Sequence, residues 1–237
     1  NPRRLIGTAA IPIDDVGWAV QELERVTKRG LRGAMIPIEA PEDLPPYRDP
    51  VYDPFWAAAQ ELDAPISVHI LGGSRFPNPF AFNTSEEKAD GARTLMLFFC
   101  EVMWVFANEF MCGGILDRFP KLKLVDSEFE ISWIPWFMNR IGEPLEQLAN
   151  RLSMPMPKMR ADEYMRSRIW HGFIDDPYAL MVIPLIGASQ ILWGTDFPHE
   201  ESVGLGAQEI AARTVGGLPR EDQEKVVGGN AAKVWGL

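Results

Sequence analysis

The chain has 237 residues, of which 46% are hydrophobic and 24% are charged, a balance that is ordinary for one soluble globular domain. Its formal net charge of −10 argues against nucleic acid or an anionic membrane as a partner. No apolar run reaches the roughly 18 residues that a membrane span needs. Cys100 and Cys112 lack metal-binding or redox spacing. We therefore expect a cytoplasmic protein with one domain over residues 1–237.

Six short apolar runs alternate with helical patterns, which is typical of βα units and a parallel sheet. The predicted strands are residues 5–11, 33–38, 66–70, 123–126, 169–173 and 191–194. No Gly-x-Gly-x-x-Gly motif follows the first of them, so a dinucleotide-binding sheet is disfavoured. The pattern predicts a (β/α)8 TIM barrel in which about six of the eight strands are present.

The intervening helices are predicted from caps and apolar spacing. Asp15 caps the first helix, and residues 221–235 form a closing helix that two internal glycines weaken. Pro184 should kink or end the helix before the last strand. Two long loops, residues 39–52 and 72–85, leave the strand ends where barrel active sites lie, and the second carries Arg75.

Polar residues stand at the ends of several predicted strands. His69 ends the third strand, and its alternative interpretation is a hydrogen-bonded structural histidine. Asp126 and Glu128 end the fourth, where burial is costly unless the carboxylates pair with a cation or a metal. His171 faces either the lumen or the helices, with a structural role favoured. Asp196 follows the last strand, and a helix-capping role is weakened by the proline two residues later.

Three strands would therefore gather imidazole and carboxylate groups on one rim of a barrel. Those donors suit Zn²⁺ or Mn²⁺, and a bound ion could polarise a carbonyl or activate a water. His69 and Asp196 are the two candidate metal ligands, and two ligands alone do not make a tight site.

Several blocks distributed along the chain resemble the amidohydrolase-related proteins near aminocarboxymuconate-semialdehyde decarboxylase. They are "RLIGTAAIP", "GLRGAMI", "YDPFWAAAQELDAPISVHI", "LDRFPKLKLVDSEFEISWIPWFMNRI", "ILWGTDFPHEES" and "GGNAAKVWGL". The resemblance implies a distorted (β/α)8 barrel of the metal-dependent hydrolase type with one divalent ion, Zn²⁺ ahead of Mn²⁺. It also implies that this chain begins at the family's third strand, without the His-x-His-like pair of the first.

The resemblance assigns roles residue by residue. His69 matches the histidine that ends the family's fifth strand, and Asp196 matches the aspartate that ends the eighth, so both are expected metal ligands. Glu128 stands where the decarboxylases often have a catalytic histidine. Two roles stay open for it: a general base, a task for which Asp196 is the other candidate, or a structural residue. Arg140 matches an arginine that can reach the substrate carboxylate of a partner subunit in a homodimer. The other expected substrate contacts are Arg75, His171 and His199.

The leading hypothesis is a metal-dependent hydrolase or decarboxylase that acts on a small carboxylic acid or carbonyl compound. A non-catalytic barrel that binds a small molecule or a partner is one alternative, motivated by the absent first-strand ligands. A metal-free glycosidase with Glu128 and Asp196 as its acid pair is the other. Metal content and sensitivity to a chelator separate the three.

Overall fold

The computed structural model describes residues 5–70, 72–73, 84, 97, 99–199 and 206–237. The predicted loop 72–85, with Arg75, lies mostly outside this described part. The residues fall into two compact units, one spanning Thr8–Leu122 and the other mainly Lys123–Leu237. Among the described residues, no helix is both long and apolar enough to cross a membrane.

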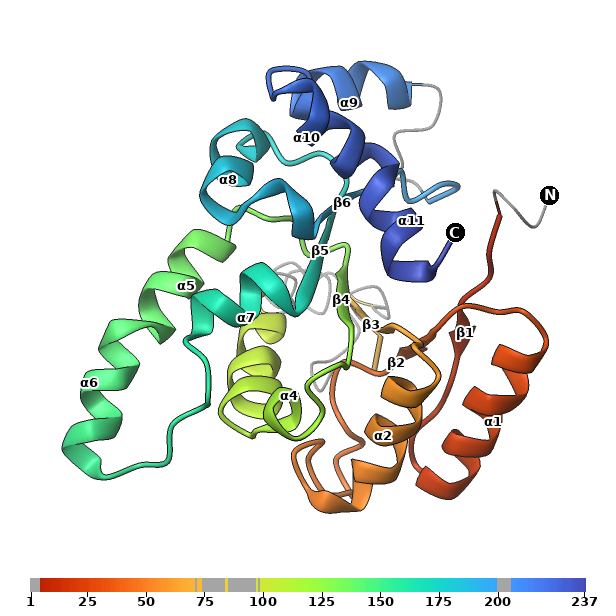
Figure 1. The fold of residues 1–237 in the computed structure, drawn as a ribbon, viewed down its shortest axis with the longest axis vertical. Coiled ribbons are helices and arrows are strands. Elements are labelled where there is room, and N and C mark those ends of the chain that lie inside the picture. The colour runs from red at the N-terminus through yellow and green to blue at the C-terminus, as the bar shows by residue number, and fades with distance from the viewer. Residues whose placement is uncertain (1–4, 71, 74–83, 85–96, 98, 200–205) are drawn as a thin grey trace. The chain divides into compact units, whose positions relative to one another are not determined.

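The first unit contains three parallel strands and the helices between them. Ala9 pairs with Ala34, and Ala34 pairs with Ile66, so the strands follow one another in chain order. Helices α1 and α2 lie side by side in this unit (Figure 1). The elements in order are β1 (Ala9–Ala10), α1 (Val16–Lys28), β2 (Ala34–Ile36), α2 (Asp53–Glu61), β3 (Ile66–His69), a π-helical segment (Phe106–Met111) and α4 (Ile115–Arg118).

Local chemistry explains the first βαβ turn. The Asp15 carboxylate accepts a hydrogen bond from the Trp18 amide at 2.9 Å, which caps α1 as predicted. Gly33 opens β2 with a φ of 82°, and a Cβ there would lie 2.4 Å from the carbonyl oxygen of Pro65. Only glycine allows β2 to approach the segment before β3 so closely.

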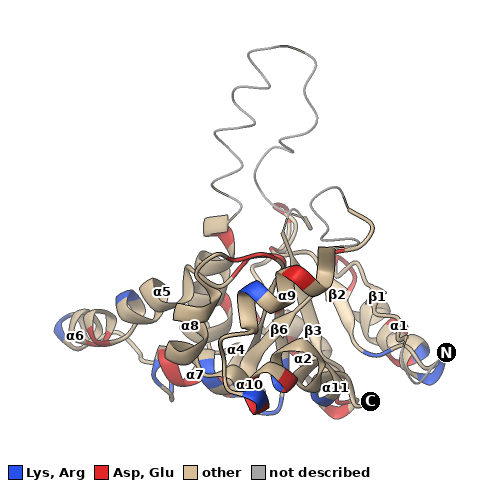
Figure 2. Ribbon diagram, turned by 90° about the horizontal axis from the view of Figure 1, so that it is seen from above, with Lys and Arg blue, Asp and Glu red and all other residues tan. Residues whose placement is uncertain are grey.

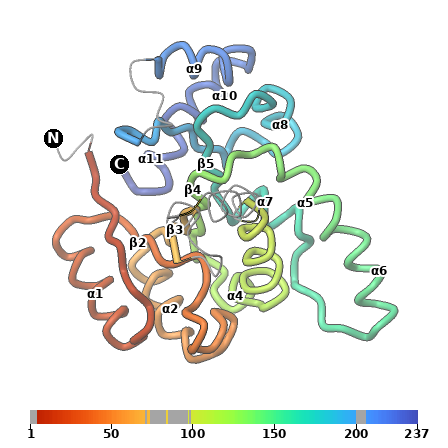
Figure 3. The backbone as a smooth tube through the Cα atoms, turned by 180° about the vertical axis from the view of Figure 1, so that it is seen from behind, coloured from red at the N-terminus to blue at the C-terminus, as the bar shows by residue number. Residues whose placement is uncertain are grey.

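The second unit repeats the parallel arrangement with three further strands. Leu124 pairs with Ile169, and His171 pairs with Ile191. The tube in Figure 3 follows the unit from green to dark blue. Its elements are β4 (Leu124–Ser127), α5 (Ile134–Ile141), α6 (Glu143–Leu152), α7 (Ala161–Ser167), β5 (Ile169–Phe173), α8 (Ala179–Ile186), β6 (Ile191–Trp193), α9 (Ala207–Val215), α10 (Arg220–Glu224) and α11 (Asn230–Trp235).

One buried cluster joins the strands of this unit to its last helix. Val125 of β4, Trp170 of β5 and Leu192 of β6 pack against Val234 of α11. Each strand contributes the apolar residue that faces the same side of the pleat, which is the period-two pattern of a buried parallel sheet. The core therefore fixes the register of the three strands, and with it the positions of their C-terminal ends.

The six predicted strands are confirmed, although most are shorter than expected. Pro184 lies inside α8, which continues only two residues further to Ile186. The closing helix is interrupted at Gly228, whose φ of 179° is extended, so the expected weakening is also confirmed.

Candidate active site

Three side chains from the second unit meet beyond the C-terminal ends of its strands. Glu128 follows β4, while Asp196 and His199 follow β6. Each offers one oxygen or nitrogen that could bind a metal, and these three atoms lie within 4.8 Å of one another. His199 Nδ1 is 3.4 Å from Asp196 Oδ2. Two of the expected rim residues, Glu128 and Asp196, therefore lie close together, with His199 beside them, within this unit.

The electrostatic character changes sharply at the strand ends. In Figure 2, β6 is drawn without charged residues, whereas red acidic segments lie in the loops and helices. The side chains of Asp196 and His199 are 27% and 57% exposed, so both reach solvent. An apolar strand such as β6 that is followed by accessible donors is the arrangement from which barrel enzymes build their sites.

The backbone at these positions is strained. Glu128, Glu130 and Asp196 have φ values of 70°, 55° and 50°, in the left-handed region that non-glycine residues seldom occupy. Such conformations cost on the order of 1–3 kcal/mol each and persist only where surrounding contacts fix them. Of the five described non-glycine residues with a positive φ, Glu128 and Asp196 belong to the candidate site.

Glu130 is a carboxyl group that the sequence reasoning missed. Its Oε1 accepts long hydrogen bonds of 3.4 Å from the amides of Ile174 and Asp175, just beyond β5. Burial raises the pKa of Glu130 from 4.5 to about 7, aided by repulsion from Asp175 and Asp176, while the two amides oppose the shift. The alternation of Glu128, Phe129 and Glu130 was the available signal, because both glutamates flank a buried aromatic residue.

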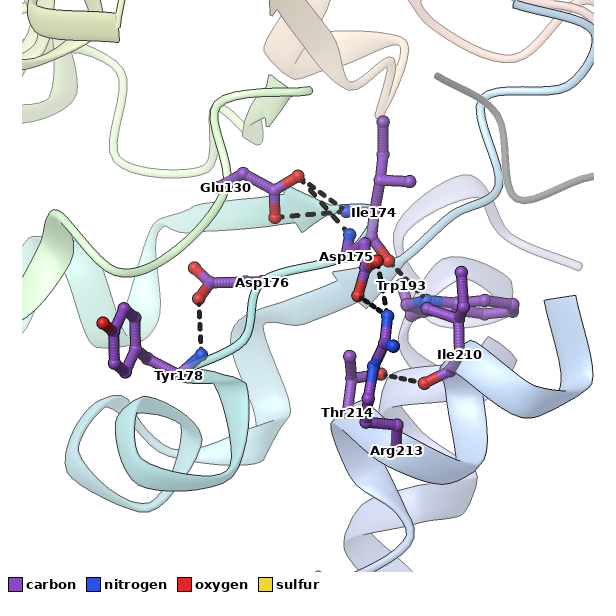
Figure 4. A network of polar contacts seen from close by, with 9 residues as sticks. All are labelled: Glu130, Ile174, Asp175, Asp176, Tyr178, Trp193, Ile210, Arg213 and Thr214. Atoms are coloured by element: carbon purple, nitrogen blue, oxygen red, sulfur yellow. Dashed lines mark hydrogen bonds and ion pairs between the residues drawn. The ribbon is translucent and has the colours of Figure 1, made fainter. Parts of the chain in front are cut away.

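Asp176 is buried and accepts hydrogen bonds from several donors. Four of them surround its carboxylate: the amides of Ile131, Ser132 and Tyr178 at 3.0, 2.8 and 2.9 Å, and the Ser132 hydroxyl at 2.5 Å. The neighbouring Asp175 binds Arg213 of α9 through both carboxylate oxygens at 2.5 Å. Figure 4 shows Asp176 with Tyr178, Asp175 with Arg213, and Glu130 with Ile174.

His171 is held inside the protein by hydrogen bonds to both of its ring nitrogens. Its side chain is fully buried, with Nδ1 2.6 Å from Asp126 Oδ2 and Nε2 2.9 Å from the carbonyl of Met165 in α7. Both ring nitrogens are occupied and the ring faces the helices, which argues against the substrate contact expected of it. Burial raises the pKa of Asp126, and the histidine opposes that shift. The partner of Asp126 is therefore His171 rather than the arginine or lysine considered as an alternative.

Three further residues are expected at the site from the sequence: His69, Arg75 and Arg140. His69 is the partly buried last residue of β3 in the first unit, and its Nδ1 is 2.6 Å from the Ile70 carbonyl. Arg140 is exposed in the last turn of α5. Arg75 lies outside the described residues. Their roles as metal ligand, partner-reaching arginine and substrate contact stay predictions.

The donor set of the cluster fits a divalent cation. Two carboxylates and one imidazole are hard and borderline ligands of the kind that hold Mn²⁺ or Zn²⁺. Parallel strands whose C-terminal loops converge on such donors define a metal-dependent enzyme of the α/β barrel class.

The chain belongs to the amidohydrolase family, whose model matches residues 1–237. It is 28% identical to the gamma-resorcylate decarboxylase of Polaromonas sp. strain JS666, and the match spans all of this chain and 72% of that protein. It is 24% identical to the 2-amino-3-carboxymuconate-6-semialdehyde decarboxylase of Dictyostelium discoideum, over all of this chain and 62% of that one. These findings confirm the expected amidohydrolase-superfamily membership near that decarboxylase.

A solved structure of a decarboxylase has a fold similar to that of this chain. The dihydroxybenzoic acid decarboxylase of Polaromonas sp. JS666, crystallised with manganese and 2-nitroresorcinol, superimposes with a TM-score of 0.78 at 25% identity. The match spans all of this chain and 70% of that one. The prediction of a partial TIM barrel of the metal-dependent hydrolase type is confirmed. A divalent metal is supported, whereas the preference for zinc is not.

Proposed function

We propose that this protein is a metal-dependent decarboxylase of a small carboxylic acid, with hydroxybenzoates as the first class to test. The observation that carries the proposal is the cluster of Glu128, Asp196 and His199 at the strand ends. The relatives named above supply the reaction class.

Of the three donors in the cluster, we assign the metal to Asp196, with His69 as its predicted companion, and we assign Glu128 and His199 to the substrate. A divalent ion bound there would supply positive charge to hold the oxygens of the substrate. The manganese of the solved neighbour favours Mn²⁺ over Zn²⁺. Carboxylate donors are compatible with either ion, so the metal itself has to be measured.

Glu128 is our candidate for moving the proton. In decarboxylation the bond between the ring carbon and the carboxylate breaks, CO₂ leaves, and the electron pair that remains on carbon takes a proton. Glu128 would relay a proton from solvent to that carbon. One oxygen of Glu128 lies within 4.8 Å of ligand atoms of Asp196 and His199, which supports this role for a substrate held at the cluster. His199, exposed at the edge of the cluster, is suited to contact the substrate.

The first experiment is elemental analysis of the purified chain, followed by CO₂ release from a panel of hydroxybenzoates with and without a chelator. About one divalent ion per chain and chelator-sensitive CO₂ release support the proposal. A metal-bearing protein that cleaves esters or amides but releases no CO₂ favours the hydrolase form of the hypothesis. Absence of metal from a folded protein favours the non-catalytic alternative. Family membership already argues against the glycosidase.

We also propose that the protein acts as a cytoplasmic homodimer in which Arg140 reaches the partner's site, as the family resemblance implies. The exposed position of Arg140 on α5 is compatible with that role. Light scattering gives the oligomeric state, and Arg140→Ala should raise KM if the arginine contacts a substrate carboxylate.

A further inference from the structure

Two loops of the second unit bind each other reciprocally. The loop after β4 sends the Glu130 carboxylate to the backbone after β5, and the loop after β5 sends the Asp176 carboxylate to the backbone after β4. We call these two carboxylates and the amides that they bind the strand-end clasp. We propose that the strand-end clasp, together with Trp193, positions Glu128 opposite Asp196; this inference rests on the proposed function.

The first half of the clasp is Glu130. Its two oxygens lie 3.4 Å from the Ile174 amide, and one of them lies 3.4 Å from the Asp175 amide. These amides come directly after β5, where the strand ladder no longer satisfies them. Glu130 therefore continues the pairing between β4 and β5 past the point where the two strands end.

The second half is Asp176, which is 2% exposed. It accepts hydrogen bonds from the amides of Ile131 and Ser132 and from the Ser132 hydroxyl. A buried carboxylate with this many donors holds them in one geometry, since losing any of them leaves polar groups unsatisfied. The segment from Glu128 to Ser132 is thus fixed on its C-terminal side, while β4 fixes it on the other.

Trp193 connects β6 to the same C-terminal end of β5. Its indole Nε1 donates to the Ile174 carbonyl at 2.9 Å, and Figure 4 shows the ring beside Ile174 and Asp175. Ile174 is therefore hydrogen-bonded through its amide to Glu130, in the loop after β4, and through its carbonyl to Trp193 of β6. Glu128 lies two residues before Glu130, and Asp196 lies three residues after Trp193.

The need for such a connection follows from the sheet order. β5 lies between β4 and β6, so Glu128 and Asp196 come from strands that do not pair with each other. Their separation depends on how each loop is attached to the end of β5. The positive φ values of Glu128, Glu130 and Asp196 agree with backbone held by contacts rather than by intrinsic preference.

Glu130 and Trp193 are expected to affect different properties of the site. Glu130→Met removes the acceptor at nearly constant side-chain length, and we expect kcat for CO₂ release at saturating Mn²⁺ to fall about tenfold, because Glu128 loses its placement. Trp193→Phe removes the N–H, and we expect the Kd for Mn²⁺ to rise about tenfold, because Asp196 loses its placement.

Matched variants separate positioning from packing. Glu130→Gln keeps one acceptor oxygen, so its kcat should stay within about threefold of wild type. Trp136→Phe changes an indole that is 58% exposed on α5, so its Kd for Mn²⁺ should stay unchanged. Thermal unfolding of each variant shows that the fold is retained.

The outcomes separate a failure of the proposed function from a failure of the strand-end clasp. A wild-type chain that neither binds Mn²⁺ nor releases CO₂ from any hydroxybenzoate overturns the proposed function, and the positioning role falls with it. A wild-type chain that does both, with equal kcat in the Gln and Met variants of Glu130, overturns the clasp alone. Equal Kd values for the two Trp→Phe variants overturn the role of Trp193.

Discussion

The two units hold their strand-end loops in different ways. In the first unit, the loop after β2 is fixed by Tyr47, whose buried ring packs edge-on against Tyr52 and Trp56 at centroid distances of 5.3 and 5.7 Å. The Tyr47 hydroxyl donates to the Pro37 carbonyl at 2.8 Å. In the second unit, the comparable loops are fixed by the carboxylates of Glu130 and Asp176.

The difference has a physical consequence. Aromatic packing excludes water and carries no charge, so a loop held that way should respond little to pH or metal. Carboxylates that bind backbone amides should respond to both pH and metal, because an ionised carboxylate is a stronger hydrogen-bond acceptor than a neutral one. Glu109, which binds the backbone and side chain of Arg48, is a charged exception in the first unit. The strand-end loops of the second unit are therefore expected to respond more strongly to pH and metal than the loop held by Tyr47.

The largest expected effects come from replacing the two carboxylates of the site, Asp196 and Glu128, and the two replacements should differ in metal content. Asp196→Asn should remove the bound metal and lower CO₂ release by roughly 100-fold or more, because it weakens a direct ligand. Glu128→Gln should retain the metal and lose activity to a similar degree, because it removes only the proton carrier. Metal content and initial rates on both variants test this contrast. If Glu128→Gln also loses the metal, Glu128 is a ligand and not the proton donor.

The next largest effect concerns the buried pair of the second unit. His171→Leu leaves the Asp126 carboxyl fully buried without its partner, and we expect the free energy of unfolding to fall by about 3–5 kcal/mol. Denaturant titration measures the change. Replacing both residues by Leu should recover part of that loss, since no isolated charge remains. A single variant as stable as wild type would show that Asp126 is adequately satisfied by the Gly172 amide alone.

Much of this architecture was predictable from the sequence, and the limits have physical causes. The strands were found because buried parallel strands are short apolar runs, and Asp126, Glu128 and Asp196 were noticed because they follow such runs. The reciprocal bonds of Glu130 and Asp176 depend on φ values and on amides 44 or 45 residues away in sequence, which periodicity does not encode. The orientation of His171 was undecidable from its alternating pattern until Met165 and Asp126 were in place.

A smaller effect should appear in the pH dependence of stability. The pKa of Glu130 is raised from 4.5 to about 7, so between these values the folded protein holds more protons than the unfolded chain. Stability contributed by this group therefore falls as pH rises through that window and is constant above it. The shift corresponds to about 3 kcal/mol at most, and to nearer 1–2 kcal/mol once solvent screening of a partly exposed carboxyl is allowed for.

Glu130→Gln tests this directly in chelator-treated protein. The variant lacks the titrating group, so its free energy of unfolding relative to wild type should rise between pH 4.5 and pH 7 and then level off. Denaturant titrations at closely spaced pH values give the difference curve. A curve that is flat over this range would mean that Glu130 titrates near its ordinary value.

The smallest predicted effect belongs to the first unit. Tyr47→Phe removes the hydroxyl that donates to the Pro37 carbonyl, and we expect a loss of about 1 kcal/mol. Burial raises the pKa of Tyr47 well above its usual value near 10, so the hydroxyl stays protonated and the loss should be the same at pH 5 and pH 8. Tyr178→Phe, at a side chain that is 58% exposed, is the matched control and should leave stability unchanged. A Tyr47 effect that varies with pH would instead implicate the neighbouring carboxylates Glu39 and Glu109, and would weaken the contrast between the two units.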